Sequence, residues 1–140
     1  MTDLSDSSNF IIKNALLSSR LSKRVGHCLS VHGMSMTEFL VLHSLEGAPR
    51  KALSRIELAE LLGMSASGIT RLVAPMEKIG LVSKESNPRD ARQSLVKISE
   101  TGQRLYSEAS VGFDHISNEL TENISSVQLE KILELYGRVK

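Results

Sequence analysis

Residues Leu53–Val82 read LSRIELAELLGMSASGITRLVAPMEKIGLV. Ser54 and Glu57 fit the S-x-x-E capping box that begins a helix, because each side chain can bond a free backbone N–H of the first turn. Gly63 is placed to end this helix, since glycine adopts the left-handed conformation at no steric cost. Ser65 can then cap a second helix. The stretch predicts a helix, a tight turn, a second helix and the start of a strand.

The second predicted helix has two contrasting faces. Its apolar residues recur at the spacing of a single helical stripe, and they are Ile69, Leu72, Val73, Met76 and Ile79. The opposite face carries small, hydroxylated or cationic side chains and no carboxylate, and its residues are Ser65, Ala66, Ser67, Thr70, Arg71 and Ala74. A helix that enters the major groove of DNA needs such a slim, uncharged or positive face. The pair of helices therefore fits the helix-turn-helix pattern, with an ordinary helical hairpin as the alternative.

Pro75 stands inside the second predicted helix. Proline has no N–H to bond the carbonyl of Arg71, and its ring crowds the preceding turn. We therefore expect a kink or a local break near Arg71–Pro75, which would leave Ser65–Arg71 as the straight segment that reads DNA.

The residues after Gly80 predict a β-hairpin. Two short strands, Leu81–Glu85 and Ser94–Ile98, flank the polar sequence SNPRDARQ. A basic loop between two strands directly after a helix-turn-helix forms a wing, which can place an arginine in the neighbouring minor groove. The expected wing residues are Arg89, Asp90 and Arg92. Because a carboxylate repels phosphate, the role expected for Asp90 is to hold an arginine and shape the loop.

Amphipathic helices are predicted on both sides of this module, over about 8–31 and 101–139, with a break near Asn123. A further capping box at Ser35 and Glu38 begins a helix that ends at Gly47. The terminal helices carry more apolar surface than the small module, about 35–99, can cover. The sequence thus predicts a single domain over 1–140, mainly α with a small β-wing: a winged helix-turn-helix module with N- and C-terminal dimerisation helices. We expect a homodimer.

Composition restricts the class of protein. The chain has 140 residues, of which 41% are hydrophobic and 24% charged, so a packed fold is expected. No apolar run reaches the ~18 residues of a membrane span, and the N-terminus lacks the pattern of a signal peptide. The single cysteine excludes an intrachain disulfide and fits a reducing compartment. These features predict a cytoplasmic protein without a membrane partner.

Charge is unevenly distributed along the chain, although the formal net charge is only +1. Residues 65–99 contain six basic and three acidic residues, a net of +3, whereas residues 100–140 contain four basic and seven acidic residues, a net of −3. A module that faces DNA with one side and turns the other side away has this distribution.

Other chemistry has weaker support. Cys28 could be a redox sensor, but it lies on the apolar stripe of its predicted helix, where cysteine is usually a small buried hydrophobe. The spacing of His27, Cys28, His32 and His43 does not place three metal ligands on one helical face, so no metal site is expected. The sequence contains neither a phosphate-binding glycine loop nor a nucleophile elbow. We expect no enzymatic activity and no cofactor.

The chain resembles the MarR family of bacterial transcriptional regulators from about Leu16 to Ala109. The resemblance rests on LSRIELAELLGMSASGITRLV and EKIGLV, on RDAR in the wing, and on the ISETG that follows. Together these motifs are specific, while the helix-turn-helix half alone would suit other winged-helix regulators. One departure from the family is the pair Ala74-Pro75, where members often carry polar or charged residues.

This resemblance implies an obligate homodimer that binds a short pseudo-palindromic operator in double-stranded DNA. The helix with Ser65, Ser67, Thr70 and Arg71 would lie in the major groove, and Arg92 at the tip of the wing in the minor groove. Repression, relieved by a small-molecule effector or an oxidant, is the usual outcome in the family. Two alternatives remain: a winged-helix module that binds protein without specific DNA binding, and a redox-sensing regulator that uses Cys28.

Overall fold

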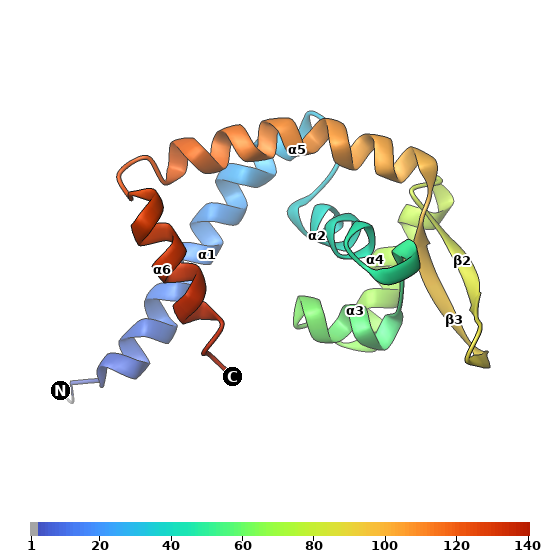
Figure 1. The fold of residues 1–140 in the computed structure, drawn as a ribbon, viewed down its shortest axis with the longest axis horizontal. Coiled ribbons are helices and arrows are strands. Elements are labelled where there is room, and N and C mark those ends of the chain that lie inside the picture. Colours follow the sequence, from blue (N-terminus) through green and yellow to red (C-terminus); the bar gives the residue numbers. More distant parts are fainter. Residues whose placement is uncertain (1–2) are drawn as a thin grey trace.

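Helices and a small sheet form an arch in this computed structural model, which describes residues 3–140 (Figure 1). In chain order the elements are α1 (Asp6–Ser30), α2 (Met36–Glu46), a short turn (Pro49–Lys51), β1 (Ala52–Ser54), α3 (Arg55–Leu62), α4 (Ala66–Lys78), β2 (Val82–Asn87), β3 (Asp90–Ile98), α5 (Glu100–Leu120) and α6 (Ser126–Tyr136). This is the mainly helical winged architecture that the sequence predicts, so the fold class is confirmed.

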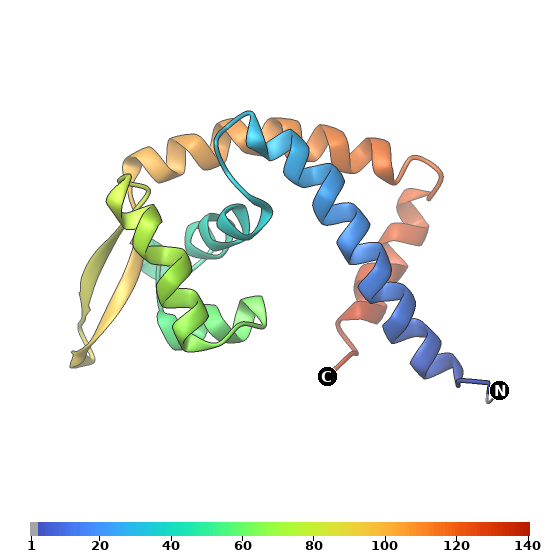
Figure 2. The same ribbon diagram turned by 180° about the vertical axis from the view of Figure 1, so that it is seen from behind.

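Helix α5 spans the top of the arch and connects its two lobes (Figures 1 and 2). At one end it continues from β3, and α2 packs beneath it through Phe39, whose ring stacks on Phe113 at 4.5 Å between centroids. At the other end the chain turns into α6, which lies beside α1. Phe10 and Tyr136 contact edge to face at 6.4 Å, and the Tyr136 hydroxyl donates to Asn14 Oδ1 at 3.1 Å. No helix among residues 3–140 is long and apolar enough to cross a membrane.

Capping boxes form at three helix starts, and the two predicted above are among them. In each, the cap hydroxyl accepts the N–H three residues on, and that residue's side chain accepts the N–H of the cap, at 2.9–3.1 Å. The pairs are Ser35 with Glu38, Ser54 with Glu57, and Ser125 with Gln128. These local bonds explain why the sequence located the helix starts well.

The sheet contains a strand that the sequence analysis missed. Ala52–Ser54 forms β1, which pairs antiparallel with β3, so the strand order is β1-β3-β2. The sequence pattern instead places Leu53 and Ser54 at the start of the helix-turn-helix. Three residues are too few to show a strand pattern, and Ser54 also caps α3. The pairing with β3 is what extends this segment.

Helix α4 runs through Pro75 from Ala66 to Lys78 as one α-helix, so the predicted local break is wrong. Pro75 itself is exposed, whereas Val73, two residues before it, and Met76, directly after it, are buried. Proline removes one hydrogen bond near the C-terminal end of the helix, while the N–H of Ile79 still bonds the Pro75 carbonyl at 3.1 Å. The packing of Val73 and Met76 in the core therefore outweighs the backbone hydrogen bond that Pro75 cannot donate.

The first turn of α5 is anchored to the start of β2. The Ser99 hydroxyl lies 2.6 Å from the carbonyl oxygen of Gly80 and 2.9 Å from that of Leu81, and it accepts the N–H of Gly102. A Cβ on Gly102 would collide with the Leu81 carbonyl oxygen. The ISETG sequence thus fixes the long helix against the wing, because only glycine permits this approach.

Candidate nucleic-acid interface

The turn between α3 and α4 is set by Gly63, which has φ 64° and ψ 35°. In this left-handed conformation its N–H, like that of Met64, bonds the Ala59 carbonyl. Leu58 of α3 and Ile69 of α4 are both completely buried in the same core. The turn geometry and this shared packing fix the orientation of α4.

Helix α4 buries its apolar stripe and presents its polar face to solvent. Ile69, Val73 and Met76 have at most 1% exposure, and Leu72 is half-buried. Ile79, predicted to continue the stripe, is instead 64% exposed, because it caps the C-terminus beyond the last buried turn. The predicted recognition residues are all exposed, namely Ser65, Ala66, Ser67, Thr70 and Arg71.

Several hydroxyls on the polar face are already engaged within the chain. Ser65 Oγ accepts the N–H of Gly68 at 3.0 Å and lies 3.2 Å from Ser67 Oγ. Thr70 Oγ1 donates to the carbonyl oxygen of Ala66 at 3.2 Å. Within the described residues 3–140, the guanidinium of Arg71 makes no hydrogen bond and no ion pair. Arg71 is thus a donor on this face that is ready to bind an external acceptor.

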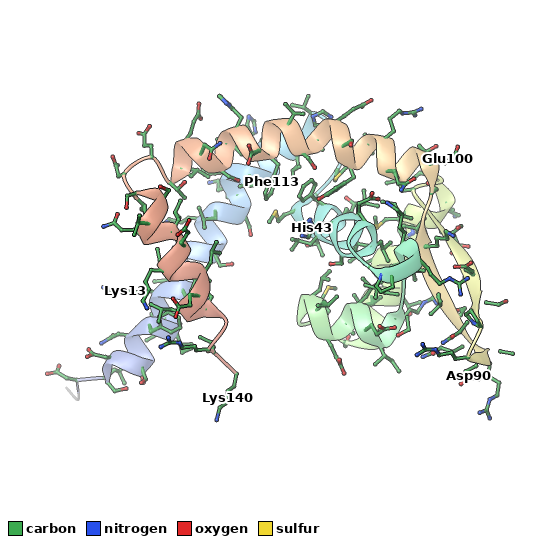
Figure 3. All side chains as sticks on the ribbon, viewed as in Figure 1. Lys13, His43, Asp90, Glu100, Phe113 and Lys140 are labelled. Atoms are coloured by element: carbon green, nitrogen blue, oxygen red, sulfur yellow. The ribbon has the colours of Figure 1, made fainter. Side chains whose placement is uncertain are left out.

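The wing is longer than predicted, and this moves Arg92 away from its tip. Asn87 pairs with Asp90 across a two-residue turn formed by Pro88 and Arg89, so the tip lies there and Arg92 belongs to β3. The irregular register beyond Ser86 hid this extension from pattern analysis. Figure 3 shows the labelled Asp90 at the far end of the hairpin.

Asp90 orients Arg92 as expected. Its Oδ1 accepts the backbone N–H of Arg92 at 3.0 Å and the Nε–H at 3.4 Å, yet the Arg92 side chain remains 93% exposed. The N–H of Arg89 bonds Asn87 Oδ1 at 2.9 Å. The carboxylate thus shapes the hairpin end while the guanidinium remains accessible to solvent.

Two further arginines, which the sequence patterns did not single out, connect the turn before β1 and the start of α3 to the wing. Arg55 in the first turn of α3 donates to Ser94 Oγ on β3 at 2.9 Å. Arg50, before β1, contacts Glu85 on β2 at 3.3 Å, and Lys97 Nζ lies 3.9 Å from the same carboxylate. No sequence spacing signals such contacts, because the partners are more than thirty positions apart.

Glu46 on α2 connects the Pro49–Lys51 turn to α5. It accepts hydrogen bonds from Lys51 Nζ at 2.5 Å and from Gln103 Nε2 at 3.1 Å. The Lys51 hydrogen bond lowers the pKa of the Glu46 carboxyl, burial opposes this shift, and the Gln103 bond and the Lys51 charge add to the lowering. Glu46 thus stays ionised where it joins three segments of the fold.

Cys28 is half-buried and lines a cleft of about 600 Å³ between α1 and α5, with Lys23, Arg24, His27, Ser30 and Ile116. His43 lies elsewhere, hydrogen-bonded through Nδ1 to the Tyr106 hydroxyl at 2.7 Å and labelled near Phe113 in Figure 3. Across the described part of the chain, no cluster of three or more His, Cys, Asp or Glu side chains could hold a metal ion.

Comparison with known proteins agrees with this geometry. The model of the MarR family matches residues 32–93. A MarR-family transcriptional regulator from Rhodococcus sp. RHA1 superposes with a TM-score of 0.85 at 20% identity, over 96% of this chain and 94% of that one. Sco3205, a MarR-family transcriptional regulator from Streptomyces coelicolor in complex with DNA, gives 0.81 at 21% identity, over 99% and 88%. A mutant MarR from E. coli complexed with operator DNA gives 0.78 at 24% identity, over 96% and 98%. At these identities the structures establish the shared fold.

Proposed function

We propose that this chain, whose residues 32–93 match the model of the MarR family, is a homodimeric transcriptional regulator that binds a pseudo-palindromic operator in double-stranded DNA. The observation that carries the proposal is the polar face of α4, which is exposed, free of carboxylates and backed by the buried side chains of Ile69, Val73 and Met76. In the family, whose members named above are transcriptional regulators, a regulatory role and not an enzymatic one is expected.

The wing supports the same proposal. Arg92 holds a nearly fully exposed guanidinium on the hairpin that follows α4, in an orientation set by Asp90. Narrow A·T-rich minor grooves concentrate negative potential and attract such a side chain. We assign base contacts in the major groove to α4, and minor-groove contact to Arg92 with Arg89 beside it.

We propose that a second copy of the chain packs against the exposed apolar side chains of the terminal helices. Large apolar side chains on α1 and α6 are 37–73% exposed, which is far more than a small stable domain leaves on two packed helices. They are Phe10, Ile11, Ile12, Leu16, Leu17 and Leu21 on α1, and Val127, Leu133, Leu135 and Tyr136 on α6. Pairing of these helices would bury this surface and present two copies of α4 to successive half-sites, because a two-fold dimer matches a palindrome.

Repression is the proposed outcome, with release by a small-molecule or oxidant signal. The cleft beside Cys28 supports this, since it lies where α1 meets α5 and offers a thiol next to three basic or titratable side chains. Peroxide titration of DNA binding by the wild type and by Cys28→Ser separates the two signals. Loss of binding in the wild type alone would indicate an oxidant sensor, and equal responses would exclude one.

DNA binding is tested by fluorescence anisotropy with a labelled duplex from upstream of the gene that encodes this chain. A scrambled duplex is the control, and both are measured over a salt series. We expect preferential binding, a steep salt dependence and two protomers per duplex. Weak and equal binding to both duplexes would leave only general electrostatic attraction. No binding to either at low salt would favour the alternative of a winged-helix module that binds protein.

A further inference from the structure

Thr70 lies in the middle of the exposed face of α4, and its hydroxyl is turned back onto the helix. Oγ1 donates its hydrogen to the Ala66 carbonyl oxygen at 3.2 Å. A hydroxyl has one hydrogen to donate. In this rotamer Thr70 therefore has no donor for the acceptors of the major groove, which are guanine N7 and O6, adenine N7 and thymine O4.

The group that Thr70 leaves accessible is its methyl, Cγ2. The two substituents on Cβ occupy different staggered positions, so a hydroxyl held against the backbone directs the methyl away from that acceptor. Ala66 and Ala74, one turn before and one turn after, are also exposed and each adds a methyl to the same helix face. The apolar feature of a base edge in the major groove is the C5-methyl of thymine.

We propose that Thr70 is a specificity-determining residue that reads a thymine in each operator half-site through contact between its Cγ2 methyl and the thymine C5-methyl. This inference rests on the proposed function and specifies which base α4 selects. Cytosine presents no methyl at this position and is disfavoured. Arg71, the next residue, supplies the free donors that bind an adjacent base or phosphate.

The test uses the full-length protein and the tightest duplex enriched from a random-sequence library. Each thymine in turn is replaced by deoxyuridine, which deletes the C5-methyl and keeps the base pair. At one thymine per half-site we expect the Kd to rise about fourfold, and about 15-fold when both half-sites are changed, from the loss of one buried methyl contact each. Deoxyuridine in the flanking base pairs is the DNA control.

Two variants assign the effect to Thr70. Thr70→Ser keeps the hydroxyl and deletes the methyl, so it should lose the same affinity on the thymine duplex and show no further loss on the deoxyuridine duplex. Thr70→Val keeps the methyl and should retain the full response to deoxyuridine. Thr101→Ser, the same deletion at an exposed site on α5, should behave as the wild type. Thermal unfolding confirms that each variant folds.

The outcomes separate this inference from the proposed function. If a duplex is enriched and deoxyuridine changes the Kd by less than twofold at every position, the methyl contact is wrong while DNA recognition stands. If Thr70→Ser keeps the deoxyuridine response, another residue contacts the thymine methyl, and if Thr70→Val loses the response, it depends on the hydroxyl. Either result contradicts the assignment of the contact to Cγ2 of Thr70. If the library yields no enriched duplex, the proposed function fails and the inference fails with it.

Discussion

Arg50 and Glu85 form an ion pair at 3.3 Å that joins the turn before β1 to the first strand of the wing. The backbone around this contact is strained, since Arg50 has φ 61° and Lys51 has φ 58°. The left-handed conformation costs about 1–2 kcal/mol for each residue that has a Cβ. Lys51 contacts Glu46 while Arg50 contacts Glu85, so the unfavourable turn directs two cations to two different elements.

Replacing Arg50 separates the strain from the ion pair. Arg50→Ala removes the pair and keeps the strain, whereas Arg50→Gly removes both. We expect Arg50→Gly to be more stable than Arg50→Ala by about 1 kcal/mol, the reverse of the usual order of alanine and glycine. Urea unfolding of the two variants measures this difference. Greater stability of the alanine variant would show that the turn does not adopt a left-handed conformation at this residue.

Gly102 should tolerate no side chain. A Cβ would meet the Leu81 carbonyl oxygen and would also lie 3.0 Å from Ile98 Cγ1. Because backbone must move to make room, Gly102→Ala should lower the free energy of unfolding by about 1–3 kcal/mol. Gly26→Ala is the matched control, since among residues 3–140 no atom outside the adjoining backbone of α1 lies within 4 Å of a Cβ there, and the substitution favours the helix. Equal stability of both variants in urea unfolding would contradict this close packing.

Glu46 should contribute stability that depends on pH. Its pKa in the folded chain lies below the ordinary value of 4.5, chiefly because Lys51 donates a hydrogen bond to it. The contribution is therefore complete above the unfolded pKa and is lost as the pH falls through the lower, folded pKa. Thermal unfolding from pH 7 to pH 3 should show Glu46→Gln less stable than the wild type at pH 7, with a gap that narrows below pH 4.5. The stability difference between Lys51→Met and the wild type should narrow over the same pH range. A stability difference that does not change with pH would contradict the pairing of Glu46 with Lys51.

Arg92→Ala should weaken DNA binding most where the flanks of the operator are rich in A·T. The exposed guanidinium gains most from a narrow minor groove, and loss of a groove contact costs about 1–3 kcal/mol. Anisotropy titrations with A·T-rich and G·C-rich flanks compare the two, and Arg104→Ala on α5 serves as the control. An equal loss on both flanks would remove the minor-groove assignment.

Ile11→Glu should separate the proposed dimer. Ile11 on α1 is 59% exposed, and a carboxylate at that position in an apolar interface would be desolvated without a partner. Sedimentation velocity should show a dimer for the wild type and a monomer for the variant, together with weaker operator binding. Ser19→Glu, an exposed position on the same helix, is the control and should remain dimeric. A wild type that sediments as a monomer at micromolar concentration would contradict the dimer itself.

Interactions between residues that are close in the sequence determined much of the secondary structure. The capping boxes at Ser35, Ser54 and Ser125 and the left-handed Gly63 involve residues at most five positions apart, so the sequence predicts them well. The two faces of α4 follow from helical periodicity in the same way. The bond between Asp90 and Arg92 spans two residues and was likewise readable from the sequence.

The tertiary structure decided the features that depend on distant partners. Strand β1 exists because Leu53 pairs with Val96, and the wing reaches Asn87 and Asp90 because the two strands continue to pair beyond Ser86. Helix α4 stays whole at Pro75 because Val73 and Met76 are packed in the core. Sequence patterns also do not predict the hydroxyl rotamer of Thr70 or the contact between Arg50 and Glu85. Sequence patterns record energies between near neighbours, whereas burial and cross-strand pairing are fixed only when the whole chain has folded.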